Sequence, residues 1–186
     1  LHSDELLAAV VSKTGGLRTG RRISHVYAMD VPAYGKPVIV TDAAINIAPT
    51  LEHKRDICQN AVELMRLLGR KQPKVAVLAA VETVNPMMPA TLDAAALTVM
   101  AARGQITGAL VDGPLAFDNA ISPEAAATKG IISQVAGEAD ILLVPHHGSR
   151  TSSTPAFLDA VGAEEAIVPA GYRNRFGHPK AEVLAR

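Results

Sequence analysis

Five short apolar runs, rich in β-branched residues, punctuate the first three quarters of the chain. They read ISHVYAMDV, PVIVTDA, PKVAVLAAVE, GALVDG and ADILLVP, and they begin at Ile23, Pro37, Pro73, Gly108 and Ala139. Runs that stay apolar without strict alternation are typical of strands buried on both faces, as in parallel sheets. The pattern therefore predicts five strands in a mostly parallel sheet.

Helical periodicity separates these runs. Between residues 50 and 68 one stripe carries the apolar positions, and Gly69 is placed to end the helix; the stripe comprises Leu51, Ile57, Ala61, Leu64, Met65 and Leu68. A second helix is predicted over 91–102. Strands that alternate with helices predict a three-layer α/β fold, with a mostly parallel sheet flanked by helices. After Pro145 a polar loop leads to a predicted short helix at 155–161 and a strand at 166–169, which we expect to pack as an addition to the sheet.

Composition narrows the classes of function. The 18 basic and 18 acidic side chains cancel, and only six residues are aromatic, so the chain lacks the charge and the stacking platform of a nucleic-acid binder. No apolar run has the length of a membrane span, and we expect no membrane partner. The single cysteine, Cys58, excludes an internal disulfide and fits a cytoplasmic protein, where we expect it to be a small buried hydrophobe.

Polar residues follow the predicted strands at the ends where open parallel sheets bind their ligands. These candidate binding residues are Asp42, Asn46, Glu82, Thr83, Asn85, Asp112, Gly113 and Asp118. Each also has a structural interpretation. Asp42 and Asp112 are suited to capping a helix or closing a turn, Gly113 and Pro114 to forming a turn, and Glu82 to pairing with a surface lysine.

Several long blocks of the first 145 residues carry a family resemblance. GLRTGRRISHVYAMDVP, PVIVTDAAINIAPTLEHKRDICQNAVELMRLLG, PKVAVLAAVETVNPMMPATLDAAAL and GQITGALVDGPLAFDNAIS closely resemble the phosphate acetyltransferase and phosphate butyryltransferase family. The resemblance implies two α/β domains with a cleft between them, and reversible acyl transfer between coenzyme A and inorganic phosphate. Coenzyme A and an acyl phosphate would be substrates, no tightly bound cofactor is expected, and a homodimer is compatible with it.

Few of the catalytic groups of that family have a matching residue in this chain. Ser3, in LHSDELL, matches the position of a phosphate-side serine or threonine, and it is equally suited to capping a helix before Asp4 and Glu5. The nearby family arginine has no counterpart, and the segment that leads to the family's Ser-Arg pair is replaced from His146 onward. The catalytic residues stay unassigned, and the resemblance implies an incomplete or chimeric second-domain portion with weak or no activity alone.

The last 45 or so residues resemble a different family. HHGS, which starts at His146 and His147, and NRFGHP, which contains His178, resemble the end of the metallo-β-lactamase-like domain of the DNA-uptake protein ComEC. The resemblance implies hydrolysis by a metal-activated water, with these three histidines as zinc ligands. The upstream ligand box of that fold is missing from the sequence, so loop histidines without metal are the favoured interpretation.

Three functional hypotheses follow. The leading one is a phosphate acyltransferase-like domain over residues 1–145, joined to a ComEC-like tail over 146–186 within a strand that both families share. The second is a metal-dependent hydrolase or metal-binding module. The third is a non-catalytic interaction module that recruits a partner through apolar surface.

Overall fold

The computed structural model of the chain describes residues 3–42, 44–46 and 48–144. Five strands form one sheet: β1 (Val26–Met29), β2 (Val38–Thr41), β3 (Lys74–Leu78), β4 (Leu110–Leu115) and β5 (Ile141–Leu143). The α-helices are α1 (Ser3–Val10), α2 (Leu51–Leu67), α3 (Pro89–Ala102), α4 (Phe117–Ile121) and α5 (Pro123–Thr128), and a 3₁₀ turn, η1, covers Pro32–Tyr34.

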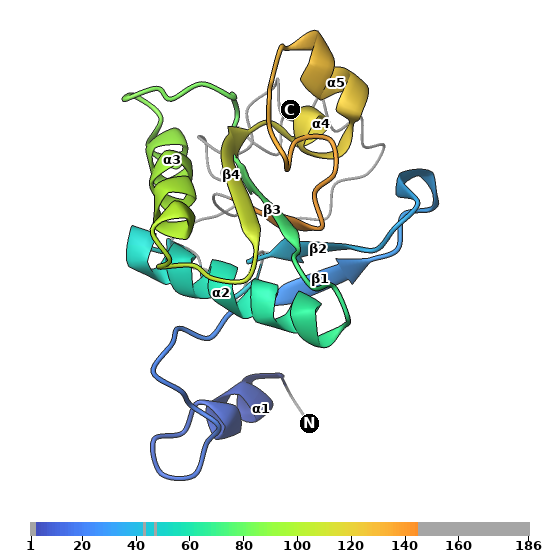
Figure 1. The fold of residues 1–186 in the computed structure, drawn as a ribbon. Helices are drawn as coiled ribbons and strands as arrows, with labels where there is room; N and C mark the ends of the chain where they lie inside the picture. The colour runs from blue at the N-terminus through green and yellow to red at the C-terminus, as the bar shows by residue number, and fades with distance from the viewer. Residues whose placement is uncertain (1–2, 43, 47, 145–186) are drawn as a thin grey trace, which may run out of the picture.

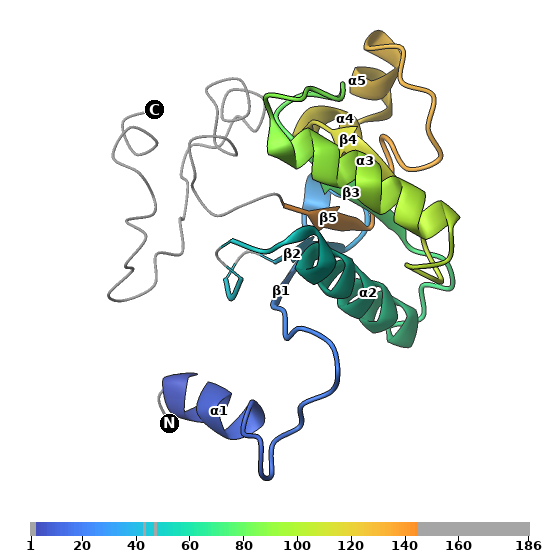
Figure 2. The same ribbon diagram turned by 90° about the vertical axis from the view of Figure 1, so that its left-hand side faces the viewer.

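The sheet has the strand order β1-β2-β5-β3-β4. The four strands from β2 to β4 pair in parallel, and β1 adds to β2 in the antiparallel sense. Helices α2 and α3 pack on one face, while α4 and the segment after α5 pack on the other (Figures 1 and 2). The predicted three-layer, mostly parallel α/β fold is confirmed.

Residues that are adjacent in a central strand enter two different cores. In β3, Val75 and Val77 face α2 and α3, whereas Ala76 and Leu78 face the α4 side. Leu142 of β5 likewise points to the α4 side, opposite to its two neighbours. Because both faces are covered, consecutive apolar residues are all buried, which explains the continuous runs in the sequence.

The two long helices begin and end close to their predicted limits. Thr50 caps α2 with a side-chain oxygen that accepts a hydrogen bond from the His53 N–H, and Leu67 is the last residue of the helix. Helix α3 starts at Pro89, two residues earlier than predicted. Proline is favourable at the first helical position because its missing N–H has no partner there in any case.

Two strands differ from their predictions. Strand β1 was expected to be buried, but it is an antiparallel edge strand whose Tyr27 and Met29 are exposed. Strand β4 was expected to end at Asp112, yet it continues to Leu115, so Asp112 pairs with Ala76 within the sheet. The Gly-Pro pair looked like a turn, but Gly113 lies within the strand. Glycine is needed at this position because a Cβ there would be only 2.7 Å from the carbonyl oxygen of Val77.

Helix α1 lies apart from the sheet, at the end of the segment that leads into β1 (Figures 1 and 2). No helix in the described part of the chain is both long and apolar enough to cross a membrane. The predicted helix at 155–161 and strand at 166–169 lie outside the described residues.

Candidate functional site

Asp42, directly after β2, is a buried carboxylate that organises its own loop. It is 4% exposed, and its Oδ1 accepts hydrogen bonds of 3.0 Å from the backbone N–H groups of Ala44 and Ile45. Its Oδ2 accepts a hydrogen bond from the Asn46 side chain. Both oxygens are therefore engaged in shaping the connection between β2 and α2.

Asn46 joins this loop to the segment before β1. Its Nδ2 also donates to the carbonyl oxygen of Ile23 at 2.9 Å, and its Oδ1 accepts from Nε of Arg22 at 2.6 Å. The backbone N–H of Arg22 donates to Oδ2 of Asp56 on α2 at 3.0 Å. Burial raises the Asp56 pKa, but hydrogen bonds from the Arg22 N–H and from Arg55 outweigh it and leave that pKa below its ordinary value.

A second charged cluster lies beyond the carboxyl ends of β3 and β4. Nζ of Lys129 is 3.1 Å from Oδ2 of Asp118 and 3.6 Å from Oε1 of Glu82. All three side chains are about one third exposed. Two predicted carboxylates that are 36 positions apart in the sequence thus share one ammonium group, and this cluster is open to solvent.

The other predicted residues near these strands have mainly structural contacts. Oδ1 of Asn85 accepts from the Met87 N–H at 2.9 Å, so Asn85 shapes the turn that precedes α3, and Thr83 is exposed. Oδ1 of Asp112 accepts from the N–H of Gly113 at 2.8 Å, and Gly113 packs closely against β3.

A partly buried ion pair connects the first turns of α2 and α3. Nζ of Lys54 lies 2.6 Å from Oδ2 of Asp93, and Lys54 is only 8% exposed. Sequence analysis missed this pair. A signal was present, because Lys54 falls on the apolar stripe of α2, three residues after Leu51 and four before Cys58.

The remaining candidates are not brought into a site by the described part of the chain. Ser3 is the first residue of α1, and its side chain lies outside the description. The three predicted zinc ligands, His146, His147 and His178, also lie outside the described residues. Within the described ranges, no group of three or more His, Cys, Asp or Glu side chains could hold a metal ion.

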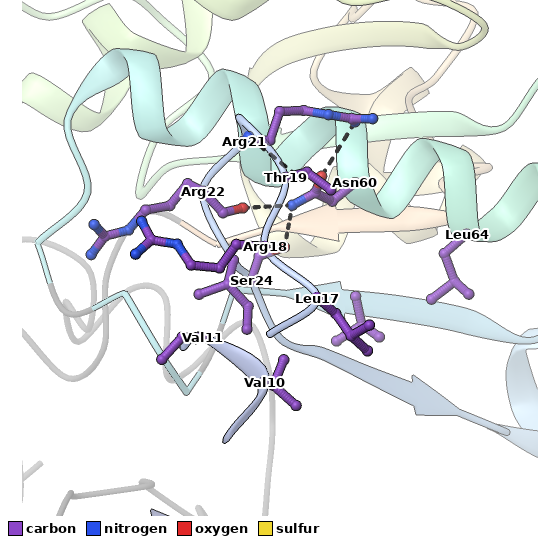
Figure 3. A pocket seen from close by; sticks show the side chains of 12 residues that line it. Val10, Val11, Leu17, Arg18, Thr19, Arg21, Arg22, Ser24, Asn60 and Leu64 are labelled. Atoms are coloured by element: carbon purple, nitrogen blue, oxygen red, sulfur yellow. Dashed lines mark hydrogen bonds between the residues drawn. The ribbon is translucent and has the colours of Figure 1, made fainter. Parts of the chain in front are cut away.

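A pocket of about 570 Å³ opens where the end of α1 and residues 17–24 approach α2 and β1 (Figure 3). Nη2 of Arg21 lies 2.7 Å from Oε2 of Glu63, which raises the Arg21 pKa, and Nη1 donates to the Asn60 side chain at 3.3 Å. Asn60 in turn donates to the carbonyl oxygen of Arg22 and to Oγ of Ser24. Sequence analysis missed this pocket, although GLRTGRR places three arginines within five residues.

The comparison with known families agrees with the observed fold. Residues 2–151 match the family described as Phosphate acetyl/butaryl transferase, and the chain belongs to this family. The match includes His146 and His147. The predicted family membership is confirmed, and nothing in the comparisons bears on a ComEC-like tail.

Individual relatives point the same way. The chain is 66% identical over 146 residues to a phosphate acetyltransferase of Rickettsia felis, a match that covers 78% of this chain and 42% of the relative. It is 56% identical over 140 residues to a probable phosphate butyryltransferase of Bacillus subtilis, covering 75% of this chain and 47% of the relative. The chain therefore spans about half the length of the curated relatives it matches.

A solved structure supports the same relationship in three dimensions. The branched-chain phosphotransacylase of Enterococcus faecalis V583 is similar with a TM-score of 0.70 and 38% sequence identity. The similarity covers 78% of this chain and 52% of that one.

Proposed function

We propose that this chain acts in reversible acyl transfer between coenzyme A and inorganic phosphate. The observation that carries the proposal is the family match over residues 2–151, and the names of the relatives, phosphate acetyltransferase and phosphate butyryltransferase, agree with it. The acyl group stays open, because relatives of both names match over nearly the same share of this chain.

The chemistry defines what a site must provide. The sulfur of coenzyme A attacks the acyl carbon of an acyl phosphate, the carbon–oxygen bond to phosphate breaks, and a base accepts the thiol proton. Such a step needs the two substrates held in line, with cationic or hydrogen-bond donors near the phosphate and the developing oxyanion.

Within this proposal, the predicted residues differ in their assigned roles. Lys129, Glu82 and Asp118 form a partly exposed cluster in which two carboxylates share one ammonium group, and this cluster is our candidate for contact with a substrate. Asp42 and Asn46 are buried and hydrogen-bonded, so we assign them to positioning the loop after β2. Roles for Ser3, Thr83, Asn85, Asp112 and Gly113 stay sequence-based proposals.

Titration of the purified chain with coenzyme A and acetyl phosphate, followed by the backbone amide signals in NMR spectra, tests the proposal. We expect shifts at residues 82–85, 118 and 129. Lys129→Gln should weaken acetyl phosphate binding about tenfold or more, because a hydrogen bond to a charged group contributes roughly 1.5–3 kcal/mol. Arg103→Gln, at the exposed end of α3, is the matched control. If these amide signals do not shift at millimolar concentrations of both compounds, the assignment is refuted.

We further propose that the chain works in the cytoplasm. The single cysteine supports this, since one cysteine forms no internal disulfide in this sequence, and Cys58 is fully buried. For homodimer formation the sequence offers only family resemblance, and light scattering of the purified chain measures it directly.

The hypothesis of a ComEC-like tail rests on the HHGS and NRFGHP motifs alone. Zinc analysis of the purified chain, with His147→Ala for comparison, tests the metal site that these motifs imply. A genomic read across residues 140–154 tests the proposed junction.

A further inference from the structure

The pocket between α1 and α2 combines a cationic side with an aliphatic wall. Arg18, Arg21 and Arg22 contribute the charge, and none of the described residues that line the pocket is a carboxylate. The aliphatic wall comes from α1, α2, β1 and the segment between them, through Val10, Val11, Leu17, Ile23, Val26 and Leu64. Its volume of about 570 Å³ lies in the range of pockets that hold small molecules.

The three arginines of this pocket are not equivalent. Arg21 is neutralised by Glu63 and fixed by Asn60. In contrast, the described residues provide no acidic partner for the guanidinium of Arg18 or of Arg22. The two guanidinium groups extend to the same side of the pocket in Figure 3. Two like charges on one side, without a carboxylate between them, favour an anionic ligand.

Arg22 is held in one orientation. Its Nε donates to Oδ1 of the buried Asn46, and its backbone N–H and C=O are bonded to Asp56 and Asn60. Within the described part of the chain, this Nε bond is the side-chain hydrogen bond of Arg22, and the two terminal nitrogens face no described acceptor. The nearby Asp56 carboxylate is already engaged, because Oδ1 accepts from Arg55 and Oδ2 from the backbone of Arg22.

We propose that Arg18 and Arg22 form a binding site for the phosphate group of a phosphate ester whose apolar or heteroaromatic body rests on the aliphatic wall. A planar guanidinium offers paired donors that match phosphate oxygens, and it is the preferred side chain for such recognition. The aliphatic wall selects against a bare phosphate ion, because an ion would leave that surface uncovered. Both coenzyme A and free adenine nucleotides contain a phosphate ester and a heteroaromatic body.

This site is separate from the Lys129 cluster, and none of its arginines belongs to the binding residues predicted from sequence. The proposal rests on the pocket and does not depend on acyl transfer. Its failure is distinguishable from failure of the proposed function, because the two sites are read from different amides: residues 17–26 and 60 here, and residues 82–85, 118 and 129 there.

The test is isothermal titration of the purified chain with adenosine 3′,5′-bisphosphate, with amide shifts recorded in parallel. We expect binding that shifts residues 17–26 and 60. The double variant Arg18→Gln/Arg22→Gln should bind the bisphosphate at least a hundredfold more weakly. Each charged hydrogen bond contributes a factor of roughly ten to a hundred to the binding constant. Arg103→Gln should bind as the parent does, and thermal unfolding of each variant checks that the fold is intact.

Adenosine, inorganic phosphate, coenzyme A and dephospho-coenzyme A complete the series. The proposal is wrong if adenosine or inorganic phosphate binds as tightly as the bisphosphate. It is also wrong if the double variant folds and binds the bisphosphate with unchanged affinity. Coenzyme A that binds at these amides, while dephospho-coenzyme A does not, identifies coenzyme A as the source of the phosphate. Binding of the bisphosphate without binding of coenzyme A identifies a free nucleotide.

Discussion

Asp140, immediately before β5, is a buried carboxylate that accepts three hydrogen bonds. It is 1% exposed, and it accepts hydrogen bonds from Nζ of Lys36 and Nη2 of Arg70, both at 2.8 Å, and from the backbone N–H of Lys74 at 2.9 Å. Burial raises the Asp140 pKa, but these donors outweigh it, so the pKa lies below its ordinary value. The side chain ties the starts of three neighbouring strands together.

Replacing this carboxylate should cost stability in a pH-dependent way. We expect Asp140→Asn to lower the free energy of unfolding by about 2–4 kcal/mol at pH 7, because several charge-assisted bonds are lost. A carboxyl group with a depressed pKa stabilises the fold above its unfolded-state pKa, and this contribution is lost as the pH falls through the folded-state pKa. The difference between parent and variant should therefore shrink below about pH 4.

Urea denaturation at pH 7 and at pH 3 measures this effect. Asp30→Asn is the control, because Asp30 is exposed just after β1. An equal destabilisation by Asp140→Asn at both pH values would mean that packing, and not charge, accounts for the role of Asp140.

Single residues differ in how far the sequence predicts them. Cys58 was expected to be a small buried hydrophobe, and its complete burial confirms that prediction. The network of Asp140 was not foreseen, since its partners Lys36, Arg70 and Lys74 lie 66 to 104 positions away. Periodicity detects neighbours on one helix or strand, and it carries no information about contacts that only the sheet order creates.

At the scale of elements, the start of α2 shows local sequence determining local structure. Oγ1 of Thr50 accepts from the N–H of His53 at 3.3 Å, and Nδ1 of His53 accepts from the N–H of Thr50 at 3.4 Å. This reciprocal capping satisfies two N–H groups that the helix itself leaves without partners. The cap also fixes where the loop after β2 ends, and with it the loop that holds Asp42 and Asn46.

Thr50→Ala should lower the free energy of unfolding by about 1 kcal/mol, the usual cost of losing such a cap. Thr50→Ser keeps the hydroxyl and should stay within about half of that change. Chemical denaturation of the two variants provides the comparison. Equal stability of Thr50→Ala and the parent would show that the helix start depends on tertiary packing alone.

Strands β1 and β4 show the limit of element prediction. An apolar run does not reveal whether its strand lies at the centre or the edge of a sheet, so the exposure of Tyr27 and Met29 was unexpected. A Gly-Pro pair favours a turn locally, whereas in β4 the missing side chain of Gly113 allows close approach to Val77. In both cases the neighbouring strand decides the outcome.

At the scale of the molecule, stability is distributed unevenly. Strand β5 lies between β2 and β3, and its three residues are at most 3% exposed. Residues 5–9 of α1 are exposed, and the helix lies apart from the sheet (Figure 2). Regions with few buried contacts open with little free energy, while central strands open only with the whole fold.

Hydrogen exchange followed by mass spectrometry should resolve this difference. We expect amides of residues 141–143 to exchange only through global unfolding, and those of α1 to exchange orders of magnitude faster. Peptides from α2 provide an internal reference. Protection of α1 equal to that of β5 would contradict the arrangement and would indicate that α1 is covered by another surface in solution.

The sequence by itself determined the class of fold, the family and the placement of the two long helices, because these follow from local periodicity, capping and long ordered motifs. It also indicated which strand ends carry polar residues. Only the tertiary structure decided which of those residues meet: Glu82 and Asp118 across Lys129, Asp42 with Asn46, and Asn46 with Arg22. The reason is physical, since strand order and crossover connections bring together side chains that no pattern along the chain relates.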